Sequence, residues 1–153
     1  MKFNSALIVV EDVKRSKKFY TEFLGQKIEN DFGENVAFEG GFCIQEKKLW
    51  REFVHKSDSE ILFRGNDAEL YFTEDLIDDF LERLNSSGAE IVCPLTEYNW
   101  GQRAVRFYDP DGHIIEVGES IEFVCRRMLS KGMSVDEVGE KSQMGSEYVR
   151  GLI

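Results

Sequence analysis

The chain has 153 residues, which is enough for one domain with a buried core and a short appendage. Its formal net charge of -10 argues against nucleic acid and anionic membranes as partners, because their phosphates would be repelled. Three widely separated cysteines, Cys43, Cys93 and Cys125, argue against a disulfide framework. The sequence shows neither a signal-peptide pattern nor an apolar run long enough for a membrane span, so we expect a cytoplasmic protein.

The first part of the chain predicts a strand, a helix and three more strands. An apolar run over residues 3–10 is followed by Asp12, the expected N-cap of a helix that ends at Gly25. A strand over residues 27–32 comes next. A hairpin over residues 36–45, turning at Gly40-Gly41, completes a β-α-β-β-β order.

The same order recurs in the second part of the chain. Residues 68–73 predict a strand, Asp75 an N-cap, and Gly88 the end of the following helix. A further strand over residues 90–92 leads to a hairpin over residues 106–116. Matching caps and glycines lie about 63 residues apart, which predicts a duplicated βαβββ unit and an α+β fold.

Two further segments lie outside this repeat. Residues 47–65 predict a short helix and a loop. After Gly118 the chain predicts helices, with a buried apolar stripe over residues 121–129, a Ser134–Glu137 capping box, and Ser146 as the cap of a last turn. Tri-helical DNA-binding domains have this outline, but no basic face emerges, so we expect packing against the main domain or a second subunit.

The chemistry of the last hairpin centres on Glu116. Strand alternation places Glu116 on one face with Ile114, and His113 on the other. A carboxylate on a largely buried strand needs a metal, a cation, a hydrogen-bonding ligand or a raised pKa. Pairing with Arg103 or Arg106 would satisfy it. The functional alternative is a cavity in which Glu116 accepts hydrogen bonds from a ligand and Arg106 binds an anionic group.

The hairpin over residues 106–116 and the helical segment over residues 12–25 resemble the vicinal-oxygen-chelate superfamily of glyoxalases, bleomycin-resistance proteins and extradiol dioxygenases. The resemblance covers about residues 1–118. It implies two paired βαβββ modules, about 1–65 and 66–118, which form a cupped mixed sheet. The helices predicted after Gly118 form a C-terminal extension over 119–153, outside the resemblance. The resemblance also implies a homodimer.

The resemblance places the family's four metal-facing positions at Ser5, Gln45, Ala68 and Glu116. Only Glu116 is a strong ligand, and a divalent ion needs about three protein ligands. No cofactor is therefore expected. If a divalent metal does bind, Glu116 and Gln45 would hold it. A shift of one residue would bring Glu69 into the Ala68 position.

The loop over residues 98–103 adds aromatic and amide side chains, and Trp100 is either a lid over a ligand or a cover for the sheet edge. We expect the ligand-binding residues to be Glu116, Gln45, Trp100, Arg106 and Tyr71, with Glu116 as the candidate catalytic group. The leading hypothesis is a glyoxalase/bleomycin-resistance-like protein that binds a small organic molecule in the cup without a metal. The alternative is a metal-dependent glyoxalase-like lyase of the lactoylglutathione lyase type, or a dioxygenase-type enzyme.

Overall fold

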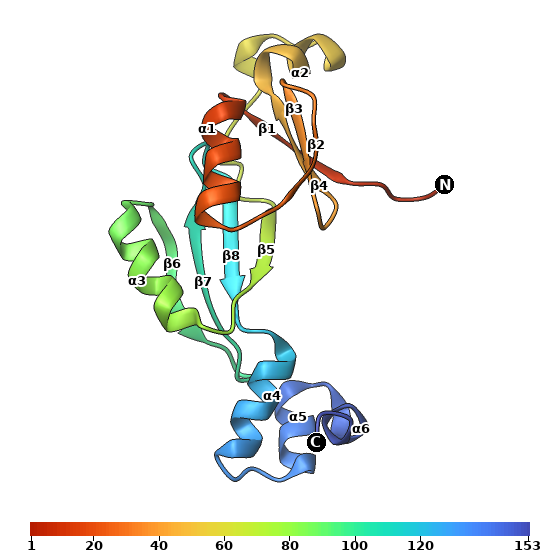
Figure 1. Ribbon diagram of the computed structural model, residues 1–153, viewed down its shortest axis with the longest axis vertical. Helices are drawn as coiled ribbons and strands as arrows, with labels where there is room; N and C mark the ends of the chain where they lie inside the picture. The colour runs from red at the N-terminus through yellow and green to blue at the C-terminus, as the bar shows by residue number, and fades with distance from the viewer. The chain divides into compact units, whose positions relative to one another are not determined.

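The computed structural model describes all 153 residues, which form two compact units (Figure 1). Unit 1 contains Met1–Asp67 and the turn Asp109–His113, and unit 2 contains Ala68–Tyr108 and Ile114–Ile153. Each unit holds one four-stranded mixed sheet, so the predicted α+β class and the repeated βαβββ order are confirmed. None of the helices is long and apolar enough to cross a membrane.

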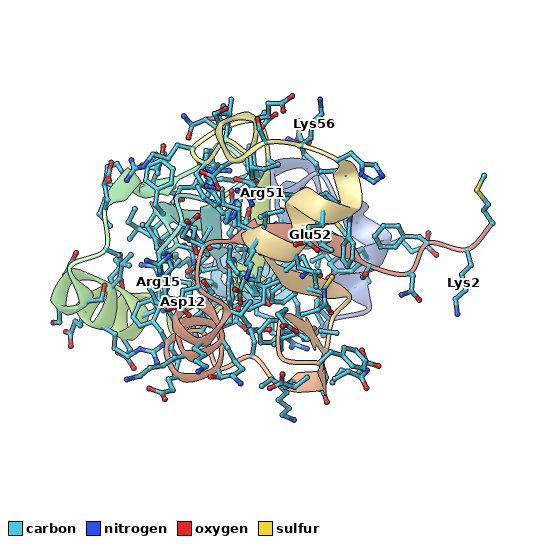
Figure 2. The ribbon with its side chains drawn as sticks, turned by 90° about the horizontal axis from the view of Figure 1, so that it is seen from above. Lys2, Asp12, Arg15, Arg51, Glu52 and Lys56 are labelled. Carbon is cyan, nitrogen blue, oxygen red and sulfur yellow. The ribbon has the colours of Figure 1, made fainter.

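In unit 1 the sheet order is β1-β4-β3-β2, with β1 parallel to β4 and the other pairs antiparallel. The strands are β1 (Ala6–Val10), β2 (Ile28–Asp31), β3 (Asn35–Phe38) and β4 (Phe42–Glu46). Helix α1 (Val13–Lys18) continues directly into a π-helical turn, Phe19–Phe23. The side chain of Asp12 accepts a hydrogen bond from the backbone N–H of Arg15 at the start of α1, which confirms the predicted N-cap (Figure 2).

Helix α1 also holds the turn Asp109–His113 through buried polar contacts. The Tyr20 hydroxyl donates to the Asp109 carboxylate at 2.8 Å, and its ring packs against Phe38. The Ser16 hydroxyl donates to Asp111 at 2.9 Å. Burial, together with the charge of Asp109, raises the pKa of Tyr20 well above its ordinary value.

The segment between the two repeats forms helix α2 (Lys47–Val54) and a short 3-10 turn, Asp58–Glu60, as predicted in outline. Figure 2 labels Arg51 and Glu52 on α2 and Lys56 just beyond it. A capping box joins Ser57 to Glu60, and Lys56 pairs with Glu60 at 2.9 Å. The backbone N–H of Ser57 and the Lys56 ammonium lower the pKa of Glu60 to about 2.

In unit 2 the sheet order is β5-β8-β7-β6, with β5 parallel to β8. The strands are β5 (Glu69–Thr73), β6 (Ile91–Glu97), β7 (Arg103–Tyr108) and β8 (Ile114–Gly118). Helix α3 (Ile77–Ser87) covers one face, where the rings of Phe80 and Phe107 lie 5.9 Å apart. The prediction that Asp75 caps α3 is wrong, because α3 begins one residue later and Leu76 precedes it. The Asp75 carboxylate instead accepts from the backbone N–H of Ser120 at 2.8 Å.

The C-terminal helices share a small apolar core of their own. They are α4 (Ile121–Ser130), α5 (Val135–Ser142) and α6 (Gly145–Arg150), and the buried cluster contains Val124, Cys125, Met128, Val138 and Val149. The buried stripe and the Ser134–Glu137 capping box are thereby confirmed. The expected Ser146 cap is wrong, because α6 starts at Gly145 and already includes Ser146.

Candidate functional site

In unit 2 the sheet face opposite α3 carries polar and aromatic side chains. Phe107 contacts α3, so the adjacent residue Arg106 projects from the other face. The strand register places Glu116 beside Arg106, and Tyr71 beside Glu116. Glu69 shares this face because it precedes Tyr71 by two residues on β5. We call this surface the open face.

Arg106 lies between the two carboxylates of the open face. Its Nε donates to Glu69 at 2.8 Å, Nη2 pairs with Glu116, and Nη1 donates to the Tyr98 hydroxyl. Partial burial lowers the pKa of Arg106, but the hydrogen bonds to Glu69 and Tyr98 outweigh this effect and raise it. Arg106 is thus one of the two partners that the sequence suggested for Glu116.

A second set of hydrogen bonds connects the open face to the aromatic loop. Trp100 Nε1 donates to Gln102 Oε1 at 2.9 Å. Gln102 Nε2 donates to the Tyr71 hydroxyl at 2.8 Å and to the backbone carbonyl of Glu119 at 2.7 Å. No sequence motif marks Gln102 as a functional residue. Its position between an aromatic loop and a strand was the only available signal.

The loop over residues 98–102 closes on itself between β6 and β7. The Tyr98 N–H donates to the Gln102 carbonyl, and the Gly101 N–H donates to the Tyr98 carbonyl, both at 2.8 Å. The rings of Tyr98 and Trp100 stack with centroids 4.6 Å apart and an interplanar angle of 4°. Gly101 has a φ of 89°, and a Cβ atom there would lie 3.2 Å from Met128 Sδ. Conformation and space therefore both favour glycine at this position.

Helix α4 supports the loop from the C-terminal extension. Arg127 Nη2 donates to the Gly101 carbonyl at 2.6 Å and to the Glu119 carboxylate at 2.8 Å. Glu119 is fully buried, and it also accepts from Arg103 Nε at 2.8 Å. The two arginines compensate the buried carboxylate, so α4, the loop and β7 form one polar cluster.

The structure brings together Glu116, Arg106, Tyr71 and Trp100 in unit 2, whereas Gln45 lies on β4 in unit 1. The Gln45 side chain is buried, and its amide is used inside the first hairpin. Its oxygen accepts from Asn35 at 3.0 Å, and its nitrogen donates to the backbone carbonyl of Glu34 at 2.9 Å.

Measured to the glycine at its end, the helix of the first repeat is one residue longer than that of the second. Val13 and Ile77 begin the two helices and lie one residue further apart than the sequence comparison predicts. The π-helical turn after α1 accounts for this, because a π-helical turn accommodates one extra residue. Strands β1 and β5, in contrast, begin at Ala6 and Glu69, about 63 residues apart, as the sequence predicts.

Comparison with known proteins identifies the family. Residues 3–122 match the family described as Glyoxalase-like domain. A protein of unknown function from Agrobacterium tumefaciens str. C58 is 41% identical, over 78% of this chain and 94% of that one, with a TM-score of 0.69.

Two less similar structures share the fold, each over 78% of this chain. A glyoxalase/bleomycin resistance protein/dioxygenase from Nocardioides is 24% identical, over 83% of its length, with a TM-score of 0.60. A lactoylglutathione lyase from Agrobacterium tumefaciens is 18% identical, over 93% of its length, with a TM-score of 0.58. None of the curated proteins matches this sequence. The chain belongs to the glyoxalase-like domain family, and with it to the vicinal-oxygen-chelate superfamily.

Proposed function

We propose that the chain binds a small organic molecule on the open face of unit 2, without a metal ion. One observation carries this proposal: the stacked aromatic loop and the polar open face form a single hydrogen-bonded network through Gln102. Small-molecule sites combine aromatic surface with a few oriented polar groups. Tyr71 is 48% exposed, so a ligand can reach its side chain.

The donor set does not fit the divalent metal of the metal-dependent relatives. Arg106 pairs with both Glu69 and Glu116, and its positive charge would repel a cation at either carboxylate. In the first repeat, the amide oxygen of Gln45 is already bonded to Asn35. Within either unit, no three His, Cys, Asp or Glu side chains form a group suited to a metal ion. These features support binding without a metal and disfavour the metal-dependent lyase.

The two tryptophans give a direct test, because Trp100 lies in the aromatic loop and Trp50 lies on α2 in unit 1. Protein with 15N-labelled tryptophan should be titrated with a library of small planar organic compounds. Binding should shift the indole signal of Trp100 in a saturable way and leave that of Trp50 unchanged. A Trp50→Phe variant assigns the two signals.

Two outcomes would contradict the proposal. The first is a library in which no compound shifts the Trp100 signal selectively. The second is near-stoichiometric Zn, Ni, Mn or Fe in protein incubated with these ions, provided that Glu116→Gln abolishes it. That result would favour the glyoxalase-like lyase. The same Glu116→Gln variant should weaken the binding of cationic or hydrogen-donating compounds, because it removes a carboxylate charge from the open face.

A further inference from the structure

The hydrogen bonds around Gln102 have a fixed direction. An indole N–H only donates, so Gln102 must turn its amide oxygen toward Trp100. The backbone carbonyl of Glu119 only accepts, so Gln102 must turn its amide nitrogen toward that group. These two constraints are independent, and both give the same amide orientation.

This orientation determines the role of the Tyr71 hydroxyl. The amide nitrogen of Gln102 has no acceptor capacity, so the Tyr71 oxygen must accept the hydrogen bond at 2.8 Å. The proton of the Tyr71 hydroxyl is not used in this bond. Because the Tyr71 side chain is about half exposed, its proton is free to point away from Gln102 and toward a ligand.

The other strong donor of the open face, Arg106, directs three of its five N–H groups to partners in the protein. Each of the three guanidinium nitrogens of Arg106 contacts a partner: Glu69, Glu116 or Tyr98. We infer that Tyr71 is the hydrogen-bond donor of the site, and that the site selects planar molecules that carry an acceptor oxygen such as a carbonyl. This inference rests on the proposed function and adds the class of ligand to it.

Gln102 is a positioning residue in this arrangement, because it acts on a ligand only through Tyr71. Gly118 provides the space that the arrangement needs. A Cβ atom at Gly118 would lie 3.3 Å from Gln102 Nε2 and 3.4 Å from the Tyr71 ring. The missing side chain thus allows the amide and the phenol to meet above β8.

Two probes of the same shape test the inference: acetophenone, and α-methylstyrene, in which a CH2 group replaces the carbonyl oxygen. Binding is measured from the Trp100 indole signal at pH 7. The wild type should bind the ketone about tenfold more tightly, the effect of one net hydrogen bond. Tyr71→Phe should remove this preference and leave the binding of the hydrocarbon unchanged.

Gln102→Leu removes the amide without removing the phenol. The Tyr71 hydroxyl then loses the hydrogen bond that orients its proton, so the ketone preference should fall. Tyr148→Phe, on α6, is the matched control and should keep the full preference. If both probes bind the wild type equally, or if Tyr71→Phe keeps the preference, the inference is overturned and the proposed binding function stands. If neither probe shifts the Trp100 signal but a compound of the library does, only the inference is overturned; if no compound of the library shifts it either, the proposed function is overturned as well.

Discussion

Glu119→Gln tests whether the C-terminal extension holds the candidate site together. The substitution keeps the shape of a fully buried side chain and removes the charge that Arg103 and Arg127 share. Removal of one partner from a buried ion pair costs about 3–5 kcal/mol. The side chains of Arg103 and Arg127 are 24% and 16% exposed and keep some contact with water. We therefore expect a loss of about 3 kcal/mol, the lower end of that range.

The assay is urea unfolding followed by circular dichroism, with the slope of the transition checked so that midpoints can be compared. Asp136→Asn is the matched control, because it also removes one carboxylate from an ion pair with an arginine in the same extension. The side chains of that pair, Arg150 and Asp136, are 64% and 78% exposed, so the control should lose less than about 0.5 kcal/mol.

A second readout concerns the loop itself. Arg127 donates to both Glu119 and the Gly101 carbonyl, so loss of the Glu119 charge should also loosen the loop that carries Trp100. In a Trp50→Phe background, acrylamide should quench Trp100 fluorescence more strongly in Glu119→Gln than in the parent. A stability loss no larger than that of Asp136→Asn, together with unchanged quenching, would refute the supporting role of the extension.

Four further predictions concern other parts of the chain. Gly118→Val should shift the Trp100 indole signal and weaken ligand binding, because even a Cβ atom would lie 3.2–3.4 Å from its neighbours; a spectrum identical to the wild type would contradict this. The pKa of Glu60 is lowered from 4.5 to about 2, so its capping box should be intact above pH 4.5 and open as the pH falls toward 2. Carboxyl NMR titration checks this, and Ser57→Ala should raise the pKa. The pKa of Tyr20 is raised above its ordinary 10.0, so its stabilising contribution should be complete below pH 10 and disappear at higher pH. Urea unfolding across this range should show the loss, and Tyr20→Phe should reduce the pH dependence. Sedimentation should show a homodimer, and a 17.7 kDa species at micromolar concentration would contradict it.

The order of helices and strands was predictable because local rules determine it. Apolar periodicity, the Asp12 cap and the glycine turn of the first hairpin each depend on residues close together in sequence. The Ser134–Glu137 capping box is equally local, and the structure confirms it. The predicted Asp75 cap was wrong because of a tertiary contact. The Asp75 carboxylate accepts a hydrogen bond from the backbone N–H of Ser120, which lies far along the chain.

The composition of the site was predictable only in part. The predicted hairpin placed Glu116 and Arg106 on adjacent strands, and the structure pairs them. The π-helical turn after α1 could not be inferred from residue types, and it adds one residue to the first helix. Gln102 was missed because its importance depends on three contacts that only the folded chain brings together.

The two repeats differ on the sheet face that carries the proposed site in unit 2. In unit 1 the Gln45 amide is bonded within its own hairpin, and the Ser5 hydroxyl lies 3.8 Å from the Cys43 thiol. In unit 2 the corresponding face continues into an aromatic loop that the first repeat lacks, and α4 packs directly on that loop. The loop and the extension both interrupt the symmetry of the duplication, and they contact each other through Arg127 and Met128. An extension that only capped the sheet would not need a buried carboxylate shared by two arginines. Arg127 of the extension donates to the Gly101 carbonyl, which indicates that the extension stabilises the loop. The loop in turn holds the orientation of Trp100, Gln102 and Tyr71.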